Sequence, residues 1–384
     1  KSILNAARQG NSNADGNFGD EGGAAGTVDK MDKPTTLGAH QTLKGDATTV
    51  NVTNHGLIQN GVDVALAGAM VNVGAGQYNE DVVIKTDNIA LLGANAGIDS
   101  NTGVRGAESV IKFSGFAGVR VKNVGGVTVD GFTIRRSYGD GDGVWLDRAT
   151  GATVSNNILT KVGHGVLAKH GFGNIIRNNA ISITGHDGIK SFHDNSLTVL
   201  DNVITNTGGD AMELDYSDDL YVSDNVIDTT KDDGIDVENG SNVTIESNTI
   251  SNVKENGVEL EHSAGVLVKN NIITNSQGNG VYFSNIDGLA PDGHPLASIY
   301  LQYNTVNGSG ADGIHGEESE SARILENTIS QSGNDGIFLH KIFGTITPVS
   351  SSLALYLDFN DIQDSGDDGI EINEAGSTII YGGA

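Results

Sequence analysis

Carboxylates gather at three places in the chain, each time as a pair two residues apart, and successive pairs are separated by 23 residues. The six residues are Glu213, Asp215, Asp236, Glu238, Glu259 and Glu261. Oxygen ligands of this kind suit Ca²⁺, and the chain has no cysteine that would favour a softer metal. The pattern predicts a Ca²⁺ site; a solvated acidic surface is the alternative.

Basic and imidazole side chains precede these pairs in the sequence. The candidates for acid–base chemistry are His164, Lys169, Lys190, His193 and Asp210. A base can abstract a proton beside a sugar carboxylate, and a nearby cation can stabilise the resulting anion. Both interpretations stay open here, because isolated Lys and His residues also balance a very acidic surface.

A third set of residues is suited to stacking on sugar rings. It consists of Trp145, Tyr282, Phe338 and His315. Aromatic rings combine a large apolar face with defined geometry, as sugar binding requires. The alternative is that nearby loops simply cover these rings.

All of these residues belong to one internal repeat. A glycine after Asp or a similar residue recurs with an asparagine fourteen residues later, and most repeats are 22 or 23 residues long. The glycine position is occupied by Gly143, Gly165, Gly188, Ala211, Gly234, Gly257, Gly280, Gly313, Gly336 and Gly369. Two steps are 33 residues long, because ten residues are inserted between the glycine and the asparagine. Such a fixed period indicates a solenoid.

Apolar residues alternate with polar ones after each glycine, as in a strand with one buried face. Three short strands fit into one coil of 23 residues, and coils stack at about 4.8 Å. We therefore predict an all-β fold, a right-handed parallel β-helix of about ten or more coils. The repeated asparagine is expected to form an amide ladder, and the Asp before each glycine to be mainly a turn residue.

The domain prediction follows from the same repeat. Residues 1–60 are expected to be an irregular N-terminal cap or linker, and residues 61–384 the β-helix, with insertions near 284–297 and 341–352. Only fifteen residues follow Gly369, so the last coil is expected to be covered by further domains of the chain or by a copy of itself.

Charge and hydropathy narrow the possible partners. The net charge of −27 disfavours nucleic acid, and it would repel a polyanionic glycan unless divalent cations intervene. No apolar run of membrane-spanning length occurs, so membrane insertion is not expected.

Residues 110–380 resemble the pectate-lyase-like β-helix superfamily, and their repeats are similar to those of alginate C5-epimerase catalytic modules. Residues 71–93 (VNVGAGQYNEDVVIKTDNIALLG) resemble the first coils of such proteins. The segment 187–193 (DGIKSFH) is similar to the epimerase motif Tyr-Gly-Phe-Asp-Pro-His, but Lys190 stands at the position of the motif's Asp and the Pro is missing. Asp210 and the pair Asp232–Asp233 match part of the polygalacturonase pattern by spacing.

The resemblance implies an extracellular or cell-surface bacterial protein that binds or processes a polysaccharide or cell-surface glycan, as a lyase, C5-epimerase or hydrolase. Because the family motifs are incomplete, the epimerase mechanism is not carried over. The alternative is a non-catalytic structural solenoid within a large bacterial surface protein, such as an adhesin, surface layer or sheath.

Overall fold

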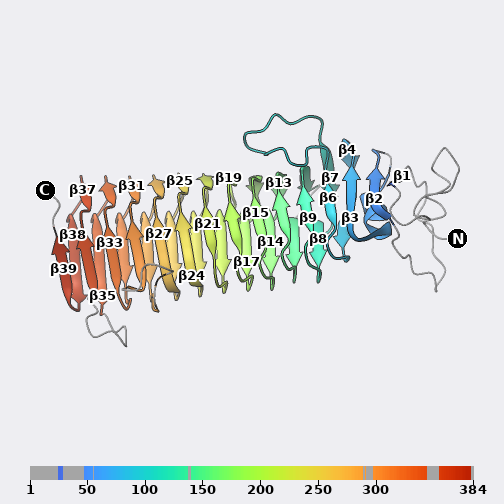
Figure 1. Ribbon diagram of the computed structural model, residues 1–384. Helices are drawn as coiled ribbons and strands as arrows, with labels where there is room; N and C mark the ends of the chain where they lie inside the picture. Colours follow the sequence, from blue (N-terminus) through green and yellow to red (C-terminus); the bar gives the residue numbers. More distant parts are fainter. Residues whose placement is uncertain are drawn as a thin grey trace. The chain divides into compact units, whose positions relative to one another are not determined.

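The computed structural model describes residues 25–28, 47–54, 56–136, 140–288, 290, 297–343 and 354–381. The chain divides into two compact units, residues 1–181 and 182–384. Within each unit short strands return in turn to three parallel sheets, as the arrows in Figure 1 show. The parallel β-solenoid predicted from the repeat is confirmed for both.

The first unit builds its three sheets from these strands. The first sheet has the order β1 (Ala25–Val28), β2 (Ala47–Val52), β3 (Ala65–Val73), β6 (Ala90–Leu92), β9 (Thr128–Asp130), β12 (Thr153–Ser155) and β15 (Ile175–Arg177). The second has β4 (Gly76–Tyr78), β7 (Ser109–Phe113), β10 (Phe132–Arg136) and β13 (Ile158–Val162). The third has β5 (Val82–Ile84), β8 (Ala117–Lys122), β11 (Asp142–Asp147) and β14 (Val166–Lys169). The strand β16 (Ala180–Thr184) contains the boundary between the units.

The second unit repeats the arrangement. One sheet has the order β17 (Ile189–Phe192), β20 (Met212–Asp215), β23 (Ile235–Glu238), β26 (Val258–Glu261), β29 (Val281–Ser284), β32 (Ile314–Glu317), β35 (Ile337–Ile342) and β38 (Ile370–Ala375). Another has β18 (Thr198–Leu200), β21 (Tyr221–Ser223), β24 (Ser241–Glu246), β27 (Ala264–Lys269), β30 (Ile299–Gln302), β33 (Ala322–Leu325), β36 (Leu355–Asp358) and β39 (Thr378–Tyr381). The last has β19 (Val203–Thr205), β22 (Val226–Asp228), β25 (Thr249–Ser251), β28 (Ile272–Thr274), β31 (Thr305–Asn307), β34 (Thr328–Ser330) and β37 (Asp361–Gln363).

Stacking in register produces the core. Ile235 pairs with Val258, 23 residues later, and Val281 pairs with Ile314, 33 residues later. These side chains point inward and are fully buried. Because strand residues alternate between faces, the residues between them point outward and form vertical rows on the surface.

The predicted asparagine ladder is confirmed. In the second unit each buried amide donates through Nδ2 to Oδ1 of the asparagine one coil later, at 2.9–3.0 Å. The same Oδ1 accepts the backbone N–H of the preceding asparagine, as Asn248 does from Asn225 at 3.0 Å. The ladder members are Asn202, Asn225, Asn248, Asn271, Asn304, Asn327 and Asn360. The ladder therefore satisfies buried polar groups at a turn that would otherwise leave them unpaired.

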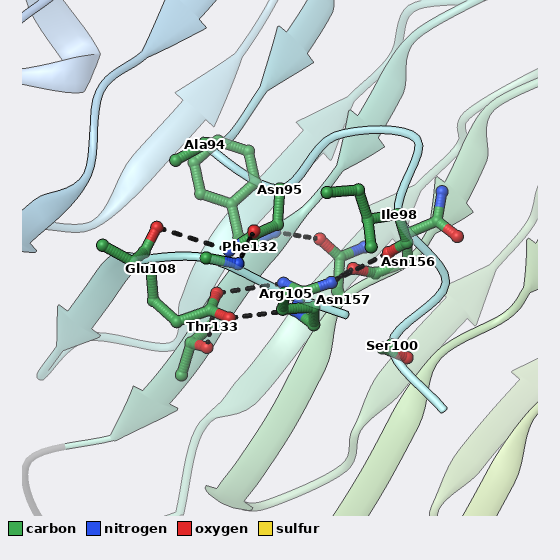
Figure 2. A network of polar contacts seen from close by, with 12 residues as sticks. Ala94, Asn95, Ile98, Ser100, Arg105, Glu108, Phe132, Thr133, Asn156 and Asn157 are labelled. Carbon is green, nitrogen blue, oxygen red and sulfur yellow. Dashed lines mark hydrogen bonds and ion pairs between the residues drawn. The ribbon is translucent and has the colours of Figure 1, made fainter. Parts of the chain in front are cut away.

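Two features of the first unit do not follow the repeat. The helix α2 (Ile58–Val64) packs on β2, β3 and β5, and the Glu80 carboxylate accepts its backbone N–H groups from Ile58 at 2.7 Å and Gln59 at 3.0 Å. The long segment between β6 and β7 is held by Arg105, as Figure 2 shows.

Arg105 donates two hydrogen bonds of 2.9 Å to Glu108, and one each to the carbonyls of Ile98 at 3.0 Å and Asn156 at 2.7 Å. Since Asn156 follows β12, this guanidinium ties the segment to a turn 51 residues away. Charge-assisted bonds of this kind are strong because Arg can hold two acceptors at fixed geometry.

The predicted domain boundary at residue 60 is only partly covered by the described residues. The strands β1 and β2 and the start of α2 lie within 1–60, and β2 pairs with β3 in parallel, so regular structure begins before residue 61. Half of the first predicted insertion and most of the second lie outside the described residues, and Pro291, Pro295 and Pro348 are among the residues that do.

Candidate functional site

The Asp before each glycine has a structural role in the second unit. Asp210 Oδ1 accepts the backbone N–H of Asp233 at 2.6 Å, and Asp233 Oδ1 accepts that of Asn256 at 2.5 Å. Asp187 binds Asp210 in the same way at 3.1 Å. These carboxylates join successive turns, as expected for turn residues. Asp210, predicted to be catalytic, is one of them.

Two positions after each glycine, outward side chains of the second unit form a continuous row. Strand register pairs each member with the next. We call this the central row: Lys190, Glu213, Asp236, Glu259, Tyr282, His315, Phe338 and Glu371. Its order along the unit is one cation, three carboxylates, three rings and a further carboxylate.

A second outward row lies two residues further along each strand. Phe192 pairs with Asp215, Glu238 pairs with Glu261, and Glu317 pairs with His340. All six carboxylates predicted to bind Ca²⁺ therefore lie in these two rows, on β20, β23 and β26.

Burial and mutual repulsion raise the pKa values of the central carboxyl groups. Burial, and then the charges of Asp210 and Glu259, raise the pKa of Asp236 from 3.8 to about 9. Burial, followed by Glu259, raises that of Asp233 to about 8. Burial also raises the pKa of Asp210 to about 7.

Lys190 is the cation at the head of the central row. Its Nζ pairs with Glu213 Oε2 and lies 3.8 Å from Asp187 Oδ2. Burial alone would lower the Lys190 pKa, but the hydrogen bond to Glu213 and the charges of the neighbouring carboxylates together raise it. The Glu213 pKa is nevertheless raised to about 7, because burial and the hydrogen bond shared with Asp187 outweigh the lysine.

Two groups of three carboxylates bring their oxygens close enough to share a metal ion. Asp187, Asp210 and Glu213 each offer an oxygen within 4.8 Å of the others, and Asp335, Asp368 and Glu371 do the same. Both groups use the same positions: the Asp before the glycine in two successive coils, and the Glu two residues after the second glycine or its replacement, Ala211. Among the described residues, Glu213 is the only one of the six predicted metal ligands in such a group.

Rings occupy the next part of the central row. The Tyr282 and His315 ring centroids are 5.4 Å apart, and those of His315 and Phe338 are 4.7 Å apart and stacked. His315 Nδ1 lies 2.7 Å from Asp312, and Nε2 lies 3.0 Å from Glu317. Burial alone would lower the His315 pKa, but the hydrogen bonds to Asp312 and Glu317 and the charges of these two carboxylates together raise it. These three of the four predicted stacking residues are half-buried and form one ladder.

The other predicted site residues have separate surroundings. His193 is exposed, with its ring 4.4 Å from Phe192 and 5.1 Å from Tyr216. His164 and Lys169 belong to the first unit, where His164 Nδ1 lies 2.8 Å from Asp142.

Lys169 ends β14 and pairs in register with Asp147 of β11. In the same unit the Arg120 guanidinium lies 3.8 Å from the Trp145 ring centroid and donates to Asp147 at 2.5 Å. One face of the Trp145 ring is therefore covered by Arg120.

Sequence reasoning missed two features of this surface. The first is the carboxylate group of Asp335, Asp368 and Glu371, which the spacing of Asp187, Asp210 and Glu213 could have revealed. The second is the aromatic cluster of Phe192, His193 and Tyr216, in which Tyr216 has a positive φ of 49° just after β20. The described part of the chain contains no helix long and apolar enough to cross a membrane.

Comparisons with known proteins agree with the β-helix fold seen in the structure. A sequence profile described as "Right handed beta helix region" matches residues 142–288, and one described as "Periplasmic copper-binding protein (NosD)" matches residues 42–212. No curated protein matches the sequence.

Solved structures with a similar fold include the Azotobacter vinelandii mannuronan C-5 epimerase AlgE4 A-module, with 16% identity, a TM-score of 0.63, and 85% of this chain and 95% of that chain covered. The Dettilon tailspike protein has 16% identity, a TM-score of 0.59, and coverage of 82% and 63%. A mutant of the periplasmic alginate epimerase AlgG has 12% identity, a TM-score of 0.51, and coverage of 86% and 77%. Together with the parallel strand register, these matches show that the chain has a right-handed parallel β-helix fold.

Proposed function

We propose that this chain binds a polysaccharide along the central row, outside the cytoplasm of a bacterium. The observation that carries the proposal is the order of the row, in which carboxylates continue directly into the ring ladder of Tyr282, His315 and Phe338. The ligand class is supported by similar structures that are named as alginate epimerases and as a tailspike protein. The location is supported by the word "periplasmic" in the names of one matching profile and one similar structure. More specifically, we propose that the chain is extracellular or lies on the cell surface.

Binding to immobilised glycans tests this proposal directly. Affinity electrophoresis would compare alginate, pectin and neutral glycans, with and without Ca²⁺. Removing a stacked ring should cost about 1–3 kcal/mol, so Tyr282→Ala should weaken binding about tenfold or more. Tyr221→Ala is the matched control, because Tyr221 is an exposed aromatic residue on a different sheet. Equal binding by wild type and Tyr282→Ala would contradict the proposal.

We further propose that Ca²⁺ binds at Asp187, Asp210 and Glu213. Three carboxylate oxygens within 4.8 Å of one another suit a hard cation, and an ion would have to displace the Lys190 ammonium from Glu213. Calorimetric titration with Ca²⁺ should therefore show binding whose stoichiometry falls by one ion in Glu213→Gln and is unchanged in Glu326→Gln. A Cu²⁺ titration belongs beside it, because one matching profile is named for copper; tight Cu²⁺ binding without Ca²⁺ binding would overturn this proposal.

We also propose, more specifically, that the chain acts on the polysaccharide as a lyase, C5-epimerase or hydrolase. Lys190, His193 and Asp210 are the candidate catalytic residues in the second unit. Unsaturated products, epimerised residues and new reducing ends would each identify one of these reactions. Lys190→Ala or His193→Ala should abolish whichever activity is found, and full activity in both would refute their roles.

A structural solenoid in a surface protein is the second candidate function. It is favoured because Asp210 is engaged in a turn and Lys190 in an ion pair, so neither is free for chemistry in this state. If no activity is detected in any of these assays and the protein self-associates with increasing concentration in sedimentation experiments, the structural function is supported over catalysis.

A further inference from the structure

A lysine of the chain itself shows what kind of cation the carboxylates of the central row can hold. The Lys190 ammonium pairs with Glu213 of the next coil and lies 3.8 Å from Asp187, the turn residue of its own coil. A primary amine is therefore held here between a turn carboxylate and a strand carboxylate.

The next coils repeat these carboxylates without the lysine. Two coils further on, Asp233 occupies the place of Asp187, Glu259 that of Glu213, and Asp236 that of Lys190. Asp233 and Glu259 are tied to neighbouring amides, since Asp233 accepts a backbone N–H and Glu259 accepts Asn256 Nδ2 at 2.5 Å. Asp236 lies between them, where repulsion adds to burial in raising its pKa. An arriving cation would relieve this repulsion.

An independent observation is that, in the described part of the chain, one carboxylate oxygen of Asp215, beside the central row, lacks a hydrogen-bond donor. Asp215 is only 9% exposed, and its Oδ1 is buried without a hydrogen-bond partner among the described residues. Its carboxyl lies beside Glu213 and Glu238. A buried carboxylate oxygen with no donor is costly, so a ligand that brings N–H donors would satisfy it.

The remaining surroundings favour a sugar as the carrier of the cation. Glu259 is followed directly by Tyr282 and His315, whose rings can stack on a sugar. The net charge of −27 favours a cationic polymer over a polyuronate. Among the described residues, the two carboxylate groups whose oxygens lie within 4.8 Å of one another include neither Asp236 nor Glu259.

We propose that the central row binds an amino-sugar polymer, with a primary ammonium group of the glycan held among Asp233, Asp236 and Glu259 and the adjoining sugar ring stacked on Tyr282. This inference rests on the proposed function and names the substrate class. It requires no bound metal, because the ligand supplies the positive charge.

The test compares two oligomers that differ only in charge. A fully deacetylated β-1,4-glucosamine oligomer and the N-acetylated oligomer of equal length are titrated into the full chain by calorimetry, with EDTA present, at a mildly acidic pH. The deacetylated oligomer should bind about tenfold or more tightly than the acetylated one, because charged hydrogen bonds contribute about 1.5–3 kcal/mol each.

Variants then locate the ammonium site. Glu259→Gln should weaken binding of the deacetylated oligomer about tenfold. Asp236→Asn should do the same, because a bound ammonium group lowers the Asp236 pKa so that the carboxyl loses its proton on binding. Asp364→Asn, an exposed acidic control, should leave binding unchanged. Both substitutions keep side-chain volume and remove repulsion, so folding should be retained, as circular dichroism can check. An oligolysine of equal charge separates a sugar from any other amine, since only the sugar should lose affinity in Tyr282→Ala.

The outcomes separate this inference from the proposed function. Equal binding of the two oligomers, or unchanged affinity in both Asp236→Asn and Glu259→Gln, would overturn the inference. Oligolysine binding as tight as glucosamine binding, with no effect of Tyr282→Ala on either, would also overturn it in favour of a basic peptide. If alginate or a neutral glycan binds, but the deacetylated oligomer binds no more tightly than the acetylated one, only the inference fails. If no glycan binds, both proposals fail.

Discussion

Asp236 lies at the centre of the acidic part of the central row, and replacing it with asparagine should stabilise the protein. The substitution keeps the shape of the side chain and removes its charge. Burial and the neighbouring carboxylates raise its pKa from 3.8 to about 9, so ionisation of this group in the folded protein is strongly unfavourable. In the unfolded chain the same carboxyl ionises near its ordinary pKa of about 3.9.

The sign and size of the effect follow from this difference. Below about pH 4 the carboxyl is protonated in both states and has no effect on stability. Between about pH 4 and pH 9 only the unfolded state releases the proton, so the free energy of unfolding falls by about 1.4 kcal/mol per pH unit. From pH 5 to pH 7 the expected loss is about 2.7 kcal/mol. At pH 7 Asp236→Asn should therefore be more stable than wild type by about 2–4 kcal/mol.

Urea unfolding at a series of pH values, without divalent cations, measures this directly. The wild type should lose stability steeply between pH 5 and pH 8, and Asp236→Asn should show a shallower slope. Asp364→Asn, with its exposed side chain, should follow the wild type. A variant that is less stable than wild type at pH 7, or that keeps the wild-type slope, would refute the electrostatic reasoning.

Three further predictions concern the repeat. Gly336→Ala should destabilise by about 1–3 kcal/mol, because its Cβ would lie 2.3 Å from the Ile362 Cγ2 atom and 2.6 Å from the Gly369 carbonyl oxygen. Gly369→Ala should be nearly neutral in the same thermal melts, since nothing lies within 4 Å there. Asn225→Ala should cost about 3 kcal/mol in urea unfolding by leaving buried ladder groups unpaired, and exposed Gln363→Ala should cost almost nothing; equal losses would contradict the ladder's role. Lys190→Met should lower stability at neutral pH by about 1–3 kcal/mol, since it removes the cation that pairs with the first carboxylates, and this loss should disappear under mildly acidic conditions.

Much of this architecture could be predicted because the repeat fixes register. Once Asn225 and Asn248 are known to lie 23 residues apart at equivalent positions, their side chains must stack, and the structure shows that bond at 2.9 Å. The same register places Glu213, Asp236 and Glu259 in one vertical row. Equal coil length was sufficient for both results, because it decides which residues become neighbours.

Side-chain contacts within the rows could not be predicted in the same way. Register brings six carboxylates together, but rotamers and the turn carboxylates decide that Glu213 joins Asp187 and Asp210 rather than Asp236. Charge counting also does not show that Lys190 pairs with Glu213.

The contacts of the first unit were harder still to predict. Arg105 reaches Asn156 across 51 residues, a separation unrelated to the period. Arg120 lies over Trp145 from a coil that precedes the first regular glycine marker, Gly143.

The asparagine ladder also shows that coils of different length can stack in the same alignment. The amides of Asn271 and Asn304 bond at 3.0 Å, as do those of Asn327 and Asn360, although each of these two coils carries ten extra residues. Added sequence at this corner therefore leaves the stacking above and below it intact. A foreign peptide grafted between β29 and β30, or between β35 and β36, should be displayed at a fixed height on the scaffold without altering its core.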